Sequence, residues 1–109
     1  MAKLEFIRKV NHAAINAATR LEIDLQSLKK DFGNDFNFLN LINTNASLNF
    51  KVFLDGQEMG YLTANNGSLS FDWQFGLTYN FLALENTDAL VNSSANDIKI
   101  FIGRTNKED

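Results

Sequence analysis

Hydrophobic and polar positions alternate one by one along residues 68–75, which read SLSFDWQF. A period of two is typical of a strand with one buried face and one solvated face. The indole of Trp73 is therefore expected in the core, and the carboxylate of Asp72 is expected to face water. Large apolar side chains on one face need an opposing layer, which neighbouring strands must supply. The apolar positions are Leu69, Phe71, Trp73 and Phe75.

Five further stretches carry strand patterns, so the chain is predicted to have six strands in all. These stretches are residues 36–42, 47–54, 57–63, 77–84 and 97–103. Apolar residues lie on both faces of 36–42, so this strand is expected to be covered on both sides. Short antiparallel strands with tight turns predict a β-sandwich or a small barrel.

Two dipeptides predict tight hairpins between these strands. Asp55-Gly56 and Asn66-Gly67 each combine residues that tolerate a left-handed backbone. They predict a three-stranded meander over residues 47–75. Residues 77–84 then either add a fourth strand to that meander or cross to a second sheet.

Residues 2–32 carry a different pattern, in which apolar positions recur at alternating spacings of three and four. This a/d seam predicts a long amphipathic helix over about four heptads. Gly33-Asn34 gives a left-handed stop after it, and Lys29 and Lys30 suit the last helical turn. The seam consists of Leu4, Ile7, Asn11, Ala14, Ala18, Leu21, Leu25, Leu28 and Phe32.

The surface that this helix contacts stays open, because periodicity cannot separate packing on the protein's own sheet from packing on another molecule. Asn11 falls at an a position, where a polar residue can fix register and oligomer state. Phe53 and Phe101 each break the polar face of a strand, so each is covered by the helix or exposed to a partner. The predicted interface consists of Leu4, Ile7, Asn11, Ala14, Ala18, Leu21, Leu25, Leu28, Phe53 and Phe101.

The length of 109 residues predicts one structural unit. Its parts are a helix over residues 2–32, an antiparallel β domain over 36–103 and a charged tail over 104–109 that is expected to fray. The fold class is therefore mainly β with one N-terminal helix. Residues 85–96 are expected to form a polar loop.

Charge and composition exclude several classes of function. The chain has 10 Lys and Arg against 13 Asp and Glu, a net charge of −3, and no cysteine. No basic stripe is present for nucleic acid, and no apolar run is long enough for a membrane span. We expect no secretory signal at the N-terminus. Without cysteine, neither a disulfide nor a thiolate metal site can form.

Residues suited to catalysis are few. His12 is the only histidine, so a histidine pair for a metal or a Ser-His-Asp triad lacks members. We expect His12 at the surface or in an interface. The glycines are dispersed at turns, so no phosphate-binding loop is present. The sequence therefore predicts no enzyme, no cofactor and no metal site.

The arrangement as a whole resembles small β-sandwich virion proteins of bacteriophages, of the penton, spike or capsid-decoration kind. The resemblance rests on the seam over 4–32, the two hairpin dipeptides and the closing strand DIKIFIG at 97–103. It implies a non-enzymatic structural protein that binds copies of itself, a major capsid protein, or both. It also implies a location in the virion, with the cytoplasm as the alternative.

A ligand-binding β-sandwich, carbohydrate- or adhesin-like, is the alternative function. Such a module needs exposed aromatic side chains, and the candidates are Tyr61 and the loop over 85–96. A small enzyme is a third possibility, which the missing His, Cys and carboxylate constellations disfavour.

Overall fold

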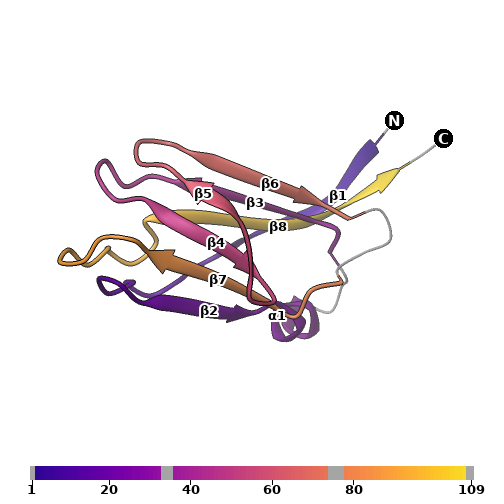
Figure 1. The fold of residues 1–109 in the computed structure, drawn as a ribbon. Helices are drawn as coiled ribbons and strands as arrows, with labels where there is room; N and C mark the ends of the chain where they lie inside the picture. The colour runs from indigo at the N-terminus through magenta and orange to yellow at the C-terminus, as the bar shows by residue number, and fades with distance from the viewer. Residues whose placement is uncertain (1, 33–35, 74–77, 108–109) are drawn as a thin grey trace.

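The computed structural model of the chain describes residues 2–32, 36–73 and 78–107. Within these residues, two four-stranded antiparallel sheets pack face to face as a sandwich, and one short helix accompanies them (Figure 1). The elements are β1 (Ala2–Val10), β2 (Arg20–Asp24), α1 (Leu25–Phe32), β3 (Phe38–Asn43), β4 (Phe50–Leu54), β5 (Gln57–Leu62), β6 (Ser68–Asp72), β7 (Phe81–Asn86) and β8 (Ile98–Lys107).

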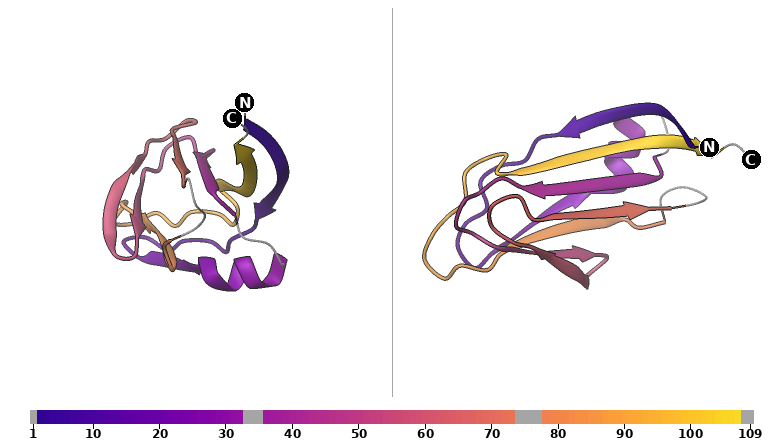
Figure 2. Two further views of the ribbon diagram at one scale, coloured as in Figure 1. Left: turned by 90° about the vertical axis from the view of Figure 1, so that its right-hand side faces the viewer. Right: turned by 90° about the horizontal axis from the view of Figure 1, so that it is seen from above.

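Sheet A has the strand order β1-β8-β3-β6, and sheet B has the order β2-β7-β4-β5. Figure 2 shows α1 at the edge of the sandwich where β1 and β2 lie, while β5 and β6 approach each other on the opposite side. The predicted antiparallel sandwich is therefore confirmed, although the described residues form eight strands where six were predicted.

The core lies between the inner faces of the two sheets. On β3, the fully buried Leu39 and Leu41 alternate with the half-buried Phe38 and Asn40, as a strand with one inner face requires. Each such aliphatic or aromatic side chain contributes about 2 kcal/mol on burial. The largest fully buried side chains are Phe36, Phe50, Ile15, Leu25, Leu39, Leu41, Leu54, Leu62, Leu82, Leu84, Ile98 and Ile100.

The prediction of one long helix over residues 2–32 is wrong. Residues Ala2–Val10 form β1, Arg20–Asp24 form β2, and Leu25–Phe32 alone is helical. β1 pairs with β8 at the far end of the chain, so long-range ladder bonds satisfy the backbone groups that a helix would satisfy locally. Between β1 and β2, Ala18 has a φ of 56°, which no right-handed helix contains.

The helix α1 begins at a capped residue. The Asp24 carboxylate accepts a hydrogen bond from the Ser27 backbone N–H over 3.0 Å, as expected of an N-cap residue. This hydrogen bond holds the pKa of Asp24 below its usual value. Leu25 is fully buried, so the first turn of α1 is anchored in the core.

The two hairpin predictions have opposite outcomes. Asp55-Gly56 joins β4 to β5, with φ values of 50° and 81° that fit a tight hairpin turn. The Asn66-Gly67 hairpin is wrong, because β6 pairs with β3 and not with β5. The chain therefore crosses from sheet B to sheet A between β5 and β6, and the predicted meander does not form.

A buried asparagine organises this crossing. The Asn43 side chain is fully buried and donates hydrogen bonds to the carbonyl groups of Leu48, Leu62 and Thr63 over 2.7, 3.1 and 3.2 Å. Its own carbonyl oxygen accepts from the Asn45 N–H over 3.0 Å. The side-chain amide thus bonds the end of β3 to the segment before β4 and to the end of β5.

The last two strands also refine the predictions. β7 lies in sheet B between β2 and β4, so it shares a sheet with β4 and β5 of the predicted meander but not with β6. Because that meander does not form, each of the two alternatives for residues 77–84 is only partly correct. The predicted strand positions Phe75 and Leu77 lie outside the described residues. β8 continues to Lys107 beside β1, so the predicted fraying is wrong for the described part of the tail.

Among the described residues, the helix present has eight residues and is too short to cross a membrane.

Candidate functional site

The outer face of sheet A brings aromatic and polar side chains together, because its strand register aligns them in rows across the sheet. One row consists of Lys9, Phe101, Asn40 and Ser70, and the next consists of Ile7, Gly103, Phe38 and Asp72. We call this surface, with Lys99, Ile42 and Ser68 of the third row, face A. The prediction that residues 36–42 are covered on both sides is therefore wrong, since their outer side lies on this face. Asp72 is exposed, as predicted.

A hollow of about 310 Å³ lies on face A, and we call it the Phe38 hollow. The Phe38 ring rests against Gly103 of the neighbouring strand β8. A Cβ atom at position 103 would lie 2.3 Å from Cζ of Phe38 and 2.4 Å from the Phe6 carbonyl oxygen. Glycine at this position is therefore what lets the half-buried ring lie against the sheet. The lining residues are Phe38, Asn40, Ser70, Phe71, Asp72 and Thr105.

Polar groups stand beside this ring. In the described part of the chain, the side-chain amide of Asn40 and the hydroxyl of Ser70 form no hydrogen bond, so both can bind a ligand. Asp72 adds a carboxylate, which already has an interaction of its own. The hollow therefore combines an apolar ring with an amide, a hydroxyl and a carboxylate.

The wall of the hollow at Thr105 is fixed from below by Asn37. The Asn37 side chain is buried, donates to the Thr105 carbonyl group over 2.9 Å and accepts from the Thr105 N–H over 2.9 Å. Its backbone N–H also donates to the Gly103 carbonyl group over 2.9 Å. These bonds hold β8 against the start of β3. The sequence shows this residue only as one of many asparagines, so its role was not predicted.

An aromatic cluster connects the hollow to the edge of the core. The rings of Phe71 and Trp73 are stacked with centroids 6.5 Å apart and an interplanar angle of 11°. Tyr79 lies against Trp73 at 6.0 Å with an angle of 53°. Trp73 is half-buried and packs against the core, which agrees with its predicted place.

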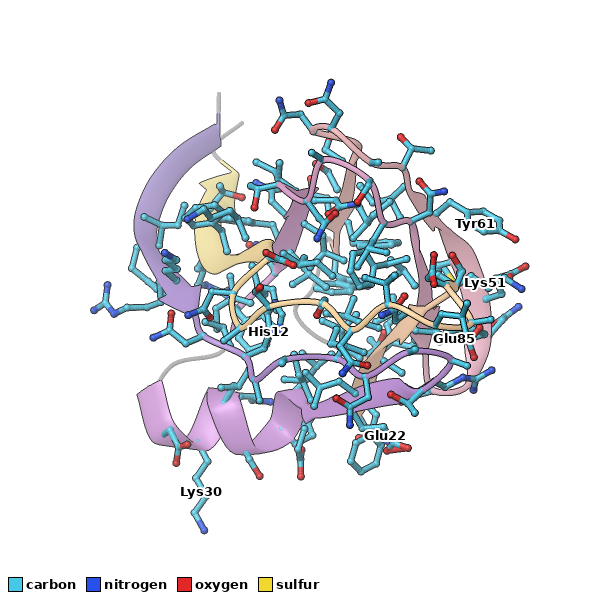
Figure 3. All side chains as sticks on the ribbon, turned by 90° about the vertical axis from the view of Figure 1, so that its left-hand side faces the viewer. His12, Glu22, Lys30, Lys51, Tyr61 and Glu85 are labelled. Carbon is cyan, nitrogen blue, oxygen red and sulfur yellow. The ribbon has the colours of Figure 1, made fainter. Side chains whose placement is uncertain are left out.

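The outer face of sheet B has a different composition. One row across it consists of Arg20, Glu85, Lys51 and Tyr61, and the next consists of Glu22, Ala83, Phe53 and Glu58. We call this surface, with Phe81 at one end of β7, face B. Figure 3 shows Tyr61, Lys51 and Glu85 grouped on this side of the molecule.

The charged groups of face B bind one another. Arg20 donates through Nε to the Glu85 carboxylate over 2.9 Å, and its guanidinium lies 3.8 Å from the centroid of the Phe53 ring. The Lys51 ammonium lies 3.5 Å from the Glu58 carboxylate. Tyr61, and then Glu58, raise the pKa of Lys51. These cross-strand pairs occupy the groups that could otherwise contact a ligand.

Face B also has a hollow, of about 250 Å³, above the small side chain of Ala83. Its end is closed by Asp55, whose carboxylate accepts from the N–H groups of Asn80 and Phe81 over 2.9 and 2.8 Å. Phe53 is 6% exposed. The Arg20 side chain covers the Phe53 ring. The predicted cover by a helix or by a partner is therefore not required to bury this ring.

His12 does not lie at the surface, so that alternative of its prediction is wrong, while the other, an interface, stays a prediction. Its ring is 8% exposed, Nε2 accepts from the Ile98 N–H over 3.1 Å, and Nδ1 faces the Ala13 carbonyl group at 2.6 Å. The hydrogen-bond network therefore assigns the proton to Nδ1. His12 joins the end of β1 to the start of β8, which is a structural task.

The loop between β7 and β8 presents an exposed apolar pair. Leu90 is 90% exposed and Val91 is 51% exposed. The Asp88 carboxylate accepts from both of their N–H groups over 2.8 Å, and these bonds hold the pKa of Asp88 below its usual value. Asn86 is fully buried and donates to the Ile15 and Val91 carbonyl groups over 3.1 and 2.8 Å. The apolar pair is thus held on a well-bonded loop.

The predicted interface residues do not form one seam, because the helix that would align them is absent. Ile7 and Phe101 lie on face A, Phe53 lies on face B, and Leu4 lies in β1. Exposed positions between β1 and β2 hold Asn11, Ala14 and Ala18. The core is in contact with Leu21, Leu25 and Leu28. Their contact with a partner stays a prediction. No group of three or more metal-ligating side chains occurs within residues 2–32, 36–73 and 78–107.

Comparisons with known proteins give one weak structural match. No protein-family model and no curated protein sequence matches the chain. A solved structure titled "The structure of CBM51 from Clostridium perfringens GH95 in complex with methyl-galactose" is similar, with a TM-score of 0.47 and 13% identity. The match covers 96% of this chain and 90% of that chain. A likeness this low carries no inference about binding.

Proposed function

We propose that this protein is a non-enzymatic ligand-binding β-sandwich that takes a saccharide on face A. The observation that supports this is the Phe38 hollow, in which a half-buried aromatic ring lies beside the Asn40 side-chain amide and the Ser70 hydroxyl, which form no hydrogen bond within the described residues. A sugar ring has an apolar C–H surface and a rim of hydroxyl groups. It therefore needs an aromatic surface and polar groups at the same place.

The individual roles follow from the side-chain chemistry. The Phe38 ring would contact the C–H surface of the sugar, and the Asn40 amide can donate to one hydroxyl while accepting from another. Ser70 and Asp72 lie on the next strand, opposite Asn40 and Phe38 respectively, so they reach the same hollow. The volume of about 310 Å³ suits a ligand of one or two rings.

The test is the substitution Phe38→Ala, measured as binding to a panel of soluble polysaccharides by affinity gel electrophoresis and then by calorimetry. We expect binding to fall by at least tenfold, because the apolar contact surface is lost. Phe81→Ala on face B removes a 43% exposed ring and is the matched control, which should bind like the unchanged protein. Equal loss in both variants, or no binding to any member of the panel, would reject the site.

A second candidate function is structural assembly, as the resemblance to phage virion proteins implies. The exposed Leu90 and Val91 on a well-bonded loop favour it, because an adjacent apolar pair held in water is suited to burial against a second copy or a shell protein. Light scattering on the full chain tests self-association. We expect Leu90→Asp to lower the mass to that of a monomer and Met59→Asp, on β5, to leave it unchanged. A monomeric unchanged protein would contradict self-association.

A further inference from the structure

Two lysines lie on face A beside the Phe38 hollow. Lys9 of β1 is directly opposite Phe101 of β8, and Lys99 precedes Phe101 by two residues on the same side of β8. Among the described residues, no carboxylate pairs with either ammonium group. Lys9 instead meets Lys99, whose hydrogen bond and positive charge lower the pKa of Lys9.

Such a pair is unfavourable for the sheet by itself. Like charges on neighbouring strands destabilise their pairing, and the opposite face shows that this fold can place a carboxylate next to each cation. An anion bound between the two ammonium groups would remove the repulsion. Lysine ammonium groups are suited to this because each is a compact charge with three donors.

The geometry connects the lysines to the hollow. Lys9, Phe101 and Asn40 follow one another in a single row across β1, β8 and β3. With neighbouring strands about 4.8 Å apart, the backbones of Lys9 and Asn40 are about 10 Å apart. The half-buried Phe101 lies between them and continues the apolar surface. That span corresponds to two linked sugar rings.

We propose that face A binds a saccharide carrying an anionic group, a carboxylate or a sulfate, with one ring in the Phe38 hollow and the anionic group between Lys9 and Lys99. This rests on the proposed function and names the class of its ligand. Face A has two cations and one carboxylate, a balance of +1, in a chain whose net charge is −3. The local charge therefore favours an anionic ligand over a neutral one.

The experiment compares polymers that differ in charge alone. Polygalacturonate and its methyl ester test the carboxylate, and dextran sulfate against neutral dextran tests the sulfate. The double variant Lys9→Gln/Lys99→Gln removes both lysines of face A and is the test. The double variant Lys30→Gln/Lys51→Gln is the control, because it has the same net charge but its changes lie on α1 and on face B (Figure 3). Binding is measured by calorimetry at low and high salt.

We expect the unchanged protein to prefer one anionic polymer to its uncharged partner by about five- to tenfold at low salt, and less at high salt. The Lys9/Lys99 variant should lose this preference, and the Lys30/Lys51 variant should keep it. Binding of the uncharged polymers equally well would overturn this proposal and leave the saccharide function standing. A preference that survives in the Lys9/Lys99 variant would also overturn it. Binding to none of the four polymers and none of the wider panel would reject both.

Discussion

Face A and face B have the same architecture, but they differ in whether their charged and polar side chains have partners on the same face. Each is the outer side of a four-stranded antiparallel sheet, and each has a hollow, lined by Phe38 on face A and by Ala83 on face B. On face B, however, Arg20 and Lys51 have carboxylates as neighbours. On face A, the lysines have each other, and the Asn40 amide has no partner within the described residues. A surface whose polar and charged groups already pair with one another gains little from a ligand. A surface where some of these groups lack a partner gains interactions when a ligand binds.

The largest difference in stability should come from the two central phenylalanines. Phe53 on face B is 6% exposed, so Phe53→Ala should lower the free energy of unfolding by about 3 kcal/mol. Phe38 on face A is half-buried, and Phe38→Ala should cost about 1 kcal/mol. Urea denaturation with an unchanged m-value measures both. Equal losses would mean that the Phe38 ring has a structural task and is not held in place for a ligand.

A smaller effect is expected where the hollow of face A depends on glycine. Gly103→Ala places a Cβ 2.4 Å from the Phe6 carbonyl oxygen, a backbone atom that cannot move aside easily. We expect a loss of about 2 kcal/mol together with loss of saccharide binding. Gly56→Ala is the control, because nothing lies within 4 Å of its Cβ and only its φ of 81° opposes the change. That variant should lose about 1 kcal/mol and bind normally. Full binding by Gly103→Ala would contradict the role of the Phe38 ring.

The smallest effects should appear as opposite responses to pH. Asp24 lies at the end of β2, and its pKa in the folded protein is below the unfolded value near 3.8. Its contribution to the free energy of unfolding is therefore present above pH 3.8 and is lost as the pH falls through the folded pKa. The folded pKa of Lys9 on face A lies below 10.5, so the unfolded chain binds more protons and stability rises as the pH approaches 10.5. Asp24→Asn should remove the acidic loss, and Lys9→Gln should remove the alkaline gain. Thermal unfolding across both pH windows measures this, and unchanged profiles in the variants would contradict it.

The alternation of apolar and polar residues determined the strand content after residue 36, but not that of residues 2–32. Leu39 and Leu41 point inward, Asp72 points outward, and Asp55-Gly56 closes its hairpin, because each of these properties depends on near neighbours in sequence. The same local rules misread residues 2–32. Leu21 and Leu25 fit a heptad seam and also fit a strand that runs into a short helix, so periodicity alone could not choose.

Tertiary structure decided the pairing of strands that are distant in sequence. β1 pairs with β8, and β6 pairs with β3 in place of its neighbour β5. These choices set the rows that bring Lys9, Asn40 and Phe38 onto one surface, and no local signal in the sequence contains them. The physical reason is that sheet hydrogen bonds join backbone groups regardless of their separation along the chain. The burial of both inner faces together, and not the preference of any one segment, therefore selects the partners.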